Sequence, residues 1–449
     1  MTTVLALTDS TEDIRHFCPE GSTFVFRIQL LPAHEHTFEH FEEIYRTLKE
    51  ACDLSTIDVV VAEYVESLPL LYFMRRDGYS CPALMVPHNN PYPLHILCYF
   101  LLLAAYSHPG DLVLCGSQNA SRAYEHLTGI RASAICTFGI SEVYRPLPRA
   151  AARRRLGLPS DRTILLYTGR FMNDKGLEPL LAVARALREE DPRILLALST
   201  THIDPPYFNR LAARMEGVVL FNRLDKAETA HLYSAADLFV SCATSVFETY
   251  AKSALEALAC GVPVVVPRWD GFPYYVDDTN GALVDVEFLP EPVDPVANPY
   301  EFARVDVDDC VAACRLVLAR PGPLAYEVPE WARYERTMRL LPGLIEDMAR
   351  VPAHTSSAAA ADGPGTADGP GAADGPRPLD LERLPRPVVA LLKHYGLTDA
   401  STLLRRADAL GLLDQTDPGE RRLLRELHNE LFSVMERERA RAGQEGVAG

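Results

Sequence analysis

The feature that most constrains the fold is an alternation of short apolar runs with amphipathic stretches, which starts once near the N-terminus and a second time further on. The first series of runs comprises Val4–Leu7, Thr23–Ile28, Ile57–Ala62, Ala83–Val86, Asp111–Cys115 and Ala134–Thr137. The second series comprises Ile164–Tyr167, Ile194–Leu198, Val218–Phe221, Leu238–Ser241, Val262–Val266 and Ala282–Val286. Short apolar runs rich in β-branched residues are typical of buried strands.

Helical patterns lie between these runs. Clear examples are Phe38–Ala51, Gln118–Leu127, Leu177–Glu189, Ala227–Ala235 and Lys252–Cys260. Strands that alternate with helices predict parallel pairing with right-handed crossovers, and therefore an α/β fold of two doubly wound, Rossmann-like domains. Ligands of such domains bind outside the carboxyl ends of the strands, so two of them predict a cleft for two substrates.

The domain boundaries follow from breaks in this rhythm. A charged passage with several prolines, Tyr144–Pro159, separates the two series. We therefore place the first domain at residues 1–150, and the second domain with its closing helices at residues 151–351. A chain of 449 residues is long enough for two or three domains.

The C-terminal part of the chain has a different character. Residues 352–377 contain a repeated Ala-Asp-Gly-Pro pattern, which cannot form a core and predicts a flexible linker. Residues 378–442 show a leucine-rich helical pattern and predict a small helical domain. We expect this appendage to bind a protein partner or to mediate self-association.

Composition narrows the class of protein. The net charge of −17 disfavours binding to nucleic acid or to anionic membranes. The N-terminal residues lack the features of a signal peptide, so we expect a cytoplasmic protein whose ten cysteines are mostly buried, reduced thiols. The apolar run Leu94–Tyr106 is well short of the ~20 residues that span a bilayer, which favours a buried helix over a membrane-docking one.

Two patterns raise the question of a metal. Cys310 and Cys314 lie one helical turn apart, but no second pair of ligands stands near them. His36-Thr37-Phe38-Glu39-His40 matches the H-x-x-E-H pattern of inverted zinc peptidases, but no later glutamate ligand stands in a similar helical context. We therefore expect no metal site and read the second pattern as a polar helix entrance.

The stretch Phe247–Pro267 carries the clearest chemical signal. A loop that holds Glu248 follows a strand, and a helix then begins near Tyr250–Lys252 and stops at Gly261, a residue suited to helix ends. Free backbone N–H groups and the positive end of the helix dipole suit a phosphate at this start. Tyr250, Ala251 and Lys252 are therefore candidate binding residues.

Two carboxylates accompany this helix start. Glu256 lies one turn beyond Lys252 on the same face, where its two acceptor oxygens suit the vicinal hydroxyls of a ribose. Glu248, in the loop above, could accept hydrogen bonds from a sugar in the same way.

Glu248 and Glu256 are separated by seven residues and followed, from Ala259, by Ala-Cys-Gly-Val-Pro-Val-Val. This pattern resembles the E-x7-E signature of the retaining GT-B glycosyltransferases of the group 1 (family 4) superfamily. The segment Tyr167–Gly176, with Gly169, Arg170 and Lys175, resembles the G-R-x4-K-G loop of the same family. That resemblance implies that Arg170 and Lys175 hold the donor diphosphate. Two cations at a strand end can neutralise the charge that grows on such a leaving group.

A residue of the first domain adds to the resemblance. His88, directly after a predicted strand, resembles a histidine of the family that faces the donor sugar across the cleft. Three departures stand beside it. Thr8–Asp13 has no glycine pair where relatives carry a Gly-rich loop, Ala251 stands where glycine is common, and Asp270–Tyr275 replaces the usual G-G-x-x-E element.

The resemblance implies an activity. The second domain would bind a nucleotide sugar as co-substrate, with no other cofactor, and the first would bind an acceptor that is a small molecule, a glycan, a lipid-linked molecule or a protein. Transfer would retain the anomeric configuration without a metal. His88, Glu248, Arg170 and Lys175 would act at the reacting centre, and Glu248 would hold sugar hydroxyls rather than act as nucleophile.

Two alternatives remain open from the sequence. One is a catalytically silent nucleotide-sugar-binding or scaffold protein of the same fold, suggested by the missing Gly-rich loop. The other is a GT-B sugar-nucleotide epimerase. A phosphorylase would need a lysine site for pyridoxal phosphate, which the sequence does not show.

Overall fold

The computed structural model describes residues 2–8, 18, 23–28, 38–91, 94–104, 106–134, 139–245, 248–289, 301, 303–320, 324–351, 389 and 393. The expected linker at 352–377 lies outside these residues, and so does the expected helical domain at 378–442, apart from two of its positions. The chain divides into two compact units. The first unit is Met1–Thr137 with Met338–Gly449, and the second unit is Phe138–Thr337.

This division differs from the boundaries drawn from the sequence at residues 150 and 351. The first unit ends before the proline-bearing passage, which thus belongs to the second unit. The last helix, α11 (Tyr334–Met348), starts in the second unit and continues in the first. Its residues Leu341, Ile345 and Met348 are buried, so its amphipathic pattern is used to cover a core.

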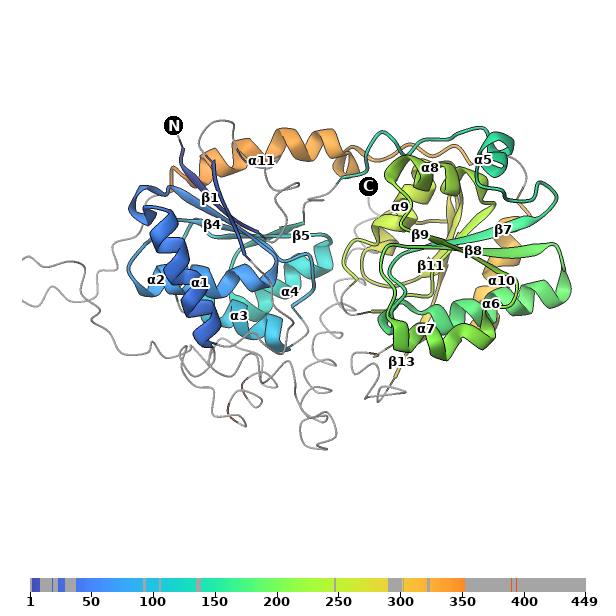
Figure 1. Ribbon diagram of the computed structural model, residues 1–449, viewed down its shortest axis with the longest axis horizontal. Coiled ribbons are helices and arrows are strands. Elements are labelled where there is room, and N and C mark those ends of the chain that lie inside the picture. Colours follow the sequence, from blue (N-terminus) through green and yellow to red (C-terminus); the bar gives the residue numbers. More distant parts are fainter. Residues whose placement is uncertain are drawn as a thin grey trace, which may run out of the picture. The chain divides into compact units, whose positions relative to one another are not determined.

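The first unit is built on a six-stranded parallel sheet in the order β2-β1-β3-β4-β5-β6. Strands β1, β4 and β5 of this sheet are labelled in Figure 1. The strands are β1 (Val4–Thr8), β2 (Thr23–Arg27), β3 (Val59–Glu63), β4 (Ala83–Val86), β5 (Leu112–Cys115) and β6 (Ala132–Ala134). The helices are α1 (Phe38–Ala51), α2 (Leu68–Arg76), α3 (Leu94–Ala104) and α4 (Gln118–Thr128), with short 3-10 turns η3 (Leu54–Thr56) and η4 (Val65–Ser67). This is the predicted doubly wound plan.

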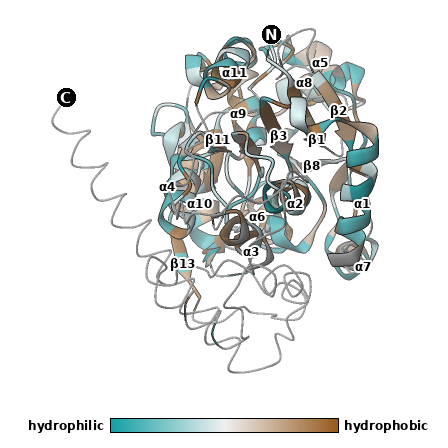
Figure 2. Ribbon diagram, turned by 90° about the vertical axis from the view of Figure 1, so that its left-hand side faces the viewer, coloured by the Kyte–Doolittle hydropathy of each residue, from teal (hydrophilic) through white to brown (hydrophobic). Residues whose placement is uncertain are grey.

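Burial explains the pattern of this sheet. Every residue of β1 and β3 is buried, and all except their last residues, Thr8 and Glu63, are apolar, as is typical of parallel strands covered by helices on both faces. Figure 2 shows these strands as hydrophobic and the visible face of α1 as largely hydrophilic. The sequence placed the last strand of this sheet at Ala134–Thr137, whereas β6 already begins at Ala132, since α4 ends at the left-handed Gly129.

The apolar run that starts at Leu94 forms helix α3, as expected. Six of its described side chains are buried: Ile96, Leu97, Tyr99, Phe100, Leu101 and Leu103. This confirms a core helix, whose apolar surface is used against the rest of the first unit. Within the part of the chain that the structure describes, none of the helices combines the length and hydrophobicity needed to cross a membrane.

The second unit has a six-stranded parallel sheet in the order β12-β11-β10-β7-β8-β9. The strands are β7 (Thr163–Thr168), β8 (Ile194–Thr200), β9 (Val218–Asn222), β10 (Leu238–Val240), β11 (Val264–Pro267) and β12 (Gly281–Val284). Helices α6 (Leu177–Glu190), α7 (Pro205–Leu211) and α10 (Val307–Leu318) cover one face, and α5 (Arg149–Arg155), α8 (Lys226–Ala235) and α9 (Lys252–Ala259) cover the other (Figure 1). Short 3-10 turns are η5 (Asn173–Lys175), η6 (Ala212–Arg214), η7 (Phe272–Tyr274) and η8 (Glu330–Ala332).

A small antiparallel pair adds to this unit. It is formed by β13 (Val286–Phe288) and β14 (Ala303–Val305). The sequence predicted one strand over Ala282–Val286, but the structure interrupts it at Asp285, whose carboxylate accepts a hydrogen bond from Arg268 at 2.6 Å.

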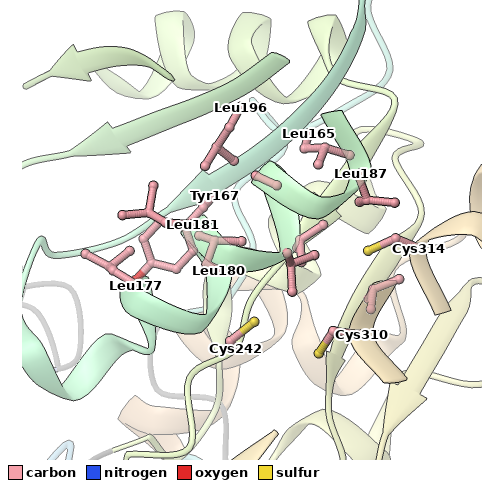
Figure 3. Packing of buried hydrophobic residues seen from close by; sticks show 14 of the residues in the cluster. Leu165, Tyr167, Leu177, Leu180, Leu181, Leu187, Leu196, Cys242, Cys310 and Cys314 are labelled. Carbon is pink, nitrogen blue, oxygen red and sulfur yellow. The ribbon is translucent and has the colours of Figure 1, made fainter. Parts of the chain in front are cut away.

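The core between the sheet and α6 and α10 is closely packed. Figure 3 shows leucines of α6 and β7 gathered with Cys242, Cys310 and Cys314. Eight cysteines of the described residues are free thiols, and seven of them are buried. Cys310 and Cys314 therefore serve as small apolar side chains of this core.

Candidate functional site

The loop after β7 positions Gly169, Arg170 and Lys175 at the carboxyl edge of the second sheet. The Gly169 amide donates to the Ser199 carbonyl at 3.0 Å, which prolongs the pairing of β7 with β8. A Cβ at position 169 would lie 2.5 Å from the Tyr167 hydroxyl, so any side chain there would require the Tyr167 ring to shift. The chain then turns through η5 and brings Lys175 back over the strand end.

Gly176 explains how this loop stays close to the neighbouring strand. Its φ is +62°, a conformation that favours glycine. A Cβ at this position would lie 2.2 Å from the Cys242 carbonyl, directly after β10. Glycine therefore lets the loop of β7 touch the end of β10, where Glu248 follows.

Lys175 and Glu248 form an ion pair, with 3.0 Å between Nζ and Oε2. The Lys175 side chain is only 12% exposed. Burial acts to lower the pKa of Lys175, but the adjacent carboxylates of Glu248 and Asp174 outweigh burial and raise it. Lys175 is thus held as a buried cation whose charge is balanced by its neighbours.

Asp174 is a site residue that the sequence reasoning did not select. Its Oδ2 lies 3.6 Å from Arg170 and 3.6 Å from Lys175, and accepts a hydrogen bond from the Ser245 hydroxyl at 3.1 Å. Its other oxygen is buried without a hydrogen-bond partner. Asp174 therefore ties the two cations to the loop that follows β10. The sequence signal that could have identified Asp174 is its position as an acidic residue between Arg170 and Lys175.

The loop from Glu248 to Ala251 is fixed by its own backbone and by aromatic residues. The Glu248 amide donates to the Ser245 carbonyl at 3.1 Å, and the Trp269 indole donates to the same carbonyl at 3.0 Å. The Tyr275 hydroxyl donates to the Ala251 carbonyl at 2.8 Å. Trp269 and Tyr275 thus hold both ends of this loop in place.

The start of α9 has the geometry expected of an anion site. Ala251 caps the helix with φ 54° and ψ 50°, a left-handed conformation that favours glycine. Lys252 is the first helical residue, and Tyr250 packs edge-on against Trp331 with ring centroids 5.8 Å apart. The free N–H groups of α9 therefore lie on the same edge of the sheet as Arg170 and Lys175.

Glu256 lies in the same helix, four residues after Lys252, and its side chain is largely buried. Its Oε2 accepts a hydrogen bond from the Tyr233 hydroxyl at 2.9 Å, and its Oε1 lies 3.9 Å from the Lys252 ammonium. Burial raises the pKa of Glu256, and Lys252 with the hydroxyls of Tyr233 and Tyr144 partly opposes this. Folding therefore keeps a carboxylate with little contact to water next to the helix start.

In the first unit, His88 follows β4 and meets a buried carboxylate. Its Nε2 lies 3.2 Å from Glu63 Oε1, and Glu63 is 1% exposed. The Thr8 hydroxyl donates to Glu63 Oε2 at 2.5 Å. His88 has φ 60° and its ring packs on Tyr64, which has φ 63°, at 4.8 Å. The carboxyl ends of three neighbouring strands thus hold the imidazole in a strained, fixed position.

These positions define what the second unit can bind. Arg170, Lys175 and the start of α9 offer positive charge and N–H donors to an anion, and Glu248 and Glu256 offer acceptors to hydroxyl groups. Among the residues described, no group of three or more histidine, cysteine and acidic side chains is arranged to hold a metal ion. His36, of the rival zinc pattern, lies outside the described residues.

Sequence comparison relates the second unit to known proteins. Residues 148–291 match the family described as glycosyl transferases group 1. The chain is 36% identical over 156 residues to the D-inositol 3-phosphate glycosyltransferase of Thermobispora bispora, a match that covers 32% of this chain and 36% of that protein. It is 35% identical over 176 residues to the enzyme of the same name from Thermobifida fusca, covering 36% and 38%. The chain therefore spans little more than a third of the length of these relatives.

Solved structures extend the likeness to both units. The sucrose-phosphate synthase of Thermosynechococcus elongatus superposes with a TM-score of 0.56 at 19% identity, covering 77% of this chain and 96% of that one. Anabaena HepE, solved in complex with UDP and glucose, superposes with a TM-score of 0.53 at 15% identity, covering 78% and 98%. At these identities the likeness establishes the fold, which is GT-B.

Proposed function

We propose that this protein, whose residues 148–291 match the family of group 1 glycosyl transferases, transfers a sugar from a nucleoside-diphosphate sugar to an acceptor with retention of anomeric configuration. The observation that carries the proposal is the group of Arg170, Lys175 and Glu248, which two separate loops bring together at the carboxyl edge of the second sheet.

The proposed donor site divides by charge. The diphosphate binds Arg170, Lys175 and the N–H groups at the start of α9, with Lys252 as a further cation. The ribose hydroxyls bind Glu256. The sugar hydroxyls bind Glu248, which donor binding releases from Lys175 when that lysine gains a phosphate partner.

The reaction follows from this arrangement. As the bond between the sugar and the diphosphate breaks, negative charge grows on the leaving phosphate, and Lys175 and Arg170 stabilise it. The acceptor hydroxyl attacks from the face that the phosphate leaves, and the phosphate oxygen takes its proton. The products are the glycosylated acceptor and the nucleoside diphosphate. His88, held by Glu63, is proposed to contact the donor sugar.

The relatives suggest the first substrates to try. UDP-glucose is the starting donor, because a solved structure of HepE with the same fold contains it. The acceptor is open, since the enzymes named for inositol phosphate match only about a third of this chain. We also propose a cytoplasmic location, consistent with the free thiols of the eight described cysteines.

The test is a transfer assay with a panel of nucleotide sugars and acceptors. Lys175→Met and Glu248→Gln should each lower transfer by about a hundredfold or more, because each removes a group that acts on the transition state. Arg185→Gln, at an exposed position of α6, is the matched charge-removal control and should leave transfer unchanged.

Three outcomes would count against the proposal. Donor that binds but is never consumed with any acceptor indicates the silent scaffold. Nucleoside diphosphate released without an acceptor, together with an altered sugar, indicates an epimerase. Full activity of Lys175→Met would show that the group at the strand ends is not the donor site.

A further inference from the structure

The second unit holds a pocket of about 720 Å³ at the edge of its sheet that lies opposite the proposed donor site. Its lining includes Thr163 and Ile194, which begin β7 and β8, and Asp237, Pro263 and Thr279, which stand just before β10, β11 and β12. In a parallel sheet all these residues lie at the amino ends, whereas Arg170, Lys175 and Glu248 lie at the carboxyl ends. The pocket is therefore separate from the donor site.

The pocket is lined by more guanidinium groups than carboxylates. The lining arginines are Arg149, Arg193, Arg315 and Arg320, and the lining acids are Glu190, Asp191 and Asp237. Asp237 is already paired with Arg153 at 2.6 Å as well as with Arg149 at 2.8 Å, so one carboxylate serves two cations. The wall thus carries excess positive charge within a chain of net charge −17.

The arginines differ in how their charge is balanced. Arg193 pairs with Asp191 at 2.8 Å, and Arg315 pairs with Glu190. Arg320 donates to the Gly281 carbonyl at 3.1 Å, which is a neutral acceptor. Part of this pattern suits the C-terminal ends of α6 and α10, where cations are favourable. Stabilisation of these helix ends does not explain why Asp237 is shared by two arginines, or why a pocket lies between the lining arginines.

The size and the remaining lining indicate the kind of ligand. Leu187, Val317 and Leu324 contribute apolar surface beside the arginines. A volume of this order suits a small organic molecule rather than a bare ion. Guanidinium groups bind phosphate oxygens in bidentate fashion, and a dianionic phosphate profits most from several cations. We propose that this pocket binds a phosphorylated small molecule, as a second ligand site apart from the donor site.

The test measures binding of glycerol 3-phosphate to the full chain by titration calorimetry, with inorganic phosphate and uncharged glycerol as companion probes. Arg149→Gln/Arg315→Gln removes two half-exposed lining cations, and Arg153 still pairs with Asp237 in this variant. Arg154→Gln/Arg155→Gln removes the same charge from exposed positions of α5 outside the pocket. Lys175→Met reports on phosphate bound at the donor site.

We expect the Arg149→Gln/Arg315→Gln variant to bind glycerol 3-phosphate at least about tenfold more weakly than the wild type. The Arg154→Gln/Arg155→Gln and Lys175→Met variants should retain wild-type affinity. Arg320→Gln is a second pocket variant with the same expected direction, and thermal unfolding verifies that each variant is folded. Equal binding by the pocket variants, loss of binding in Lys175→Met alone, equal binding of glycerol, or no binding by the wild type would each overturn the proposal.

Discussion

At the scale of single residues, Glu256 is a carboxylate that folding removes from water. Its pKa is raised above the usual 4.5 by burial, which Lys252, Tyr233 and Tyr144 only partly offset. A carboxyl group with a raised folded-state pKa costs stability while it is ionised, and this cost disappears as the pH falls through that pKa. A role in holding a ribose would explain why a charged group is kept at a position that the fold alone does not favour.

Glu256→Gln should therefore stabilise the unliganded protein at neutral pH, by about 1 kcal/mol, while weakening donor binding. The glutamine oxygen can still accept the Tyr233 hydroxyl. Urea unfolding of the variant and the wild type at neutral and mildly acidic pH measures the difference, which should shrink on acidification. A variant less stable than the wild type at neutral pH would show that the ionised carboxylate holds the fold together.

Asp174 and Glu63 show why some site residues escaped sequence reasoning. Glu63 ends the buried run of β3, and its partner His88 follows β4. Only the adjacency of β3 and β4 in the sheet brings the two together, and a sequence does not state strand order. Asp174 stood in a recognised loop, but its contact with Ser245 depends on the meeting of two loops. Lys175 and Glu248 were selected through a spacing pattern, and the structure brings their side chains within 3.0 Å of each other.

At the scale of elements, the start of α9 combines a functional position with backbone strain. Ala251 is held in the left-handed region by the Tyr275 hydroxyl bond to its carbonyl. Alanine in this region costs about 1–2 kcal/mol, and glycine avoids this cost but loses more chain entropy on folding. Glycine would therefore adopt this backbone conformation at a lower energetic cost than the alanine that this chain has at position 251.

Ala251→Gly should leave the free energy of unfolding unchanged or raise it by up to about 1 kcal/mol. Ala257→Gly, in the buried interior of the same helix, is the matched control and should lower it by about 1 kcal/mol or more. Denaturant unfolding of both variants and the wild type measures these changes in the free energy of unfolding. If Ala251→Gly is destabilised as much as Ala257→Gly, position 251 is not strained.

The elements themselves were predictable because most of them repeat one pattern. A parallel strand buried on both faces reads as a short apolar run, and its helices read as amphipathic stretches, so the six strands of each sheet were located from sequence. The pair β13–β14 was not located from the sequence, since strands of three residues are too short to show a recognisable hydrophobic pattern. The chain's return to the first unit within α11 was also missed, because a helical pattern does not specify which core it covers.

At the scale of the whole molecule, the proposed reaction requires both units. The proposed donor-binding residues belong to the second unit, and His88 with Glu63 belongs to the first. His88→Ala should lower kcat for transfer on the order of a hundredfold, because the sugar loses a positioned contact. UDP affinity should be unchanged, since all the proposed nucleotide contacts lie in the second unit.

Glu63→Gln separates a positioning role of Glu63 from a merely structural one. The amide keeps the volume and can still accept the Thr8 hydroxyl, but it removes the charge beside His88. We expect about a tenfold lower kcat with unchanged UDP affinity and unchanged thermal stability. If thermal stability falls and kcat does not, the pair serves the fold rather than the reaction.

The C-terminal appendage gives the last prediction. A chain that ends at Val351 keeps all of α11, whose buried residues Leu341, Ile345 and Met348 complete the first unit. Because the expected linker at 352–377 separates this helix from the expected helical domain, removal of everything after Val351 should leave UDP affinity and thermal stability unchanged. Sedimentation of the full chain should show association that the shortened chain has lost. A fall in UDP affinity on shortening would mean that the appendage supports the donor site, which a tethered interaction domain does not do.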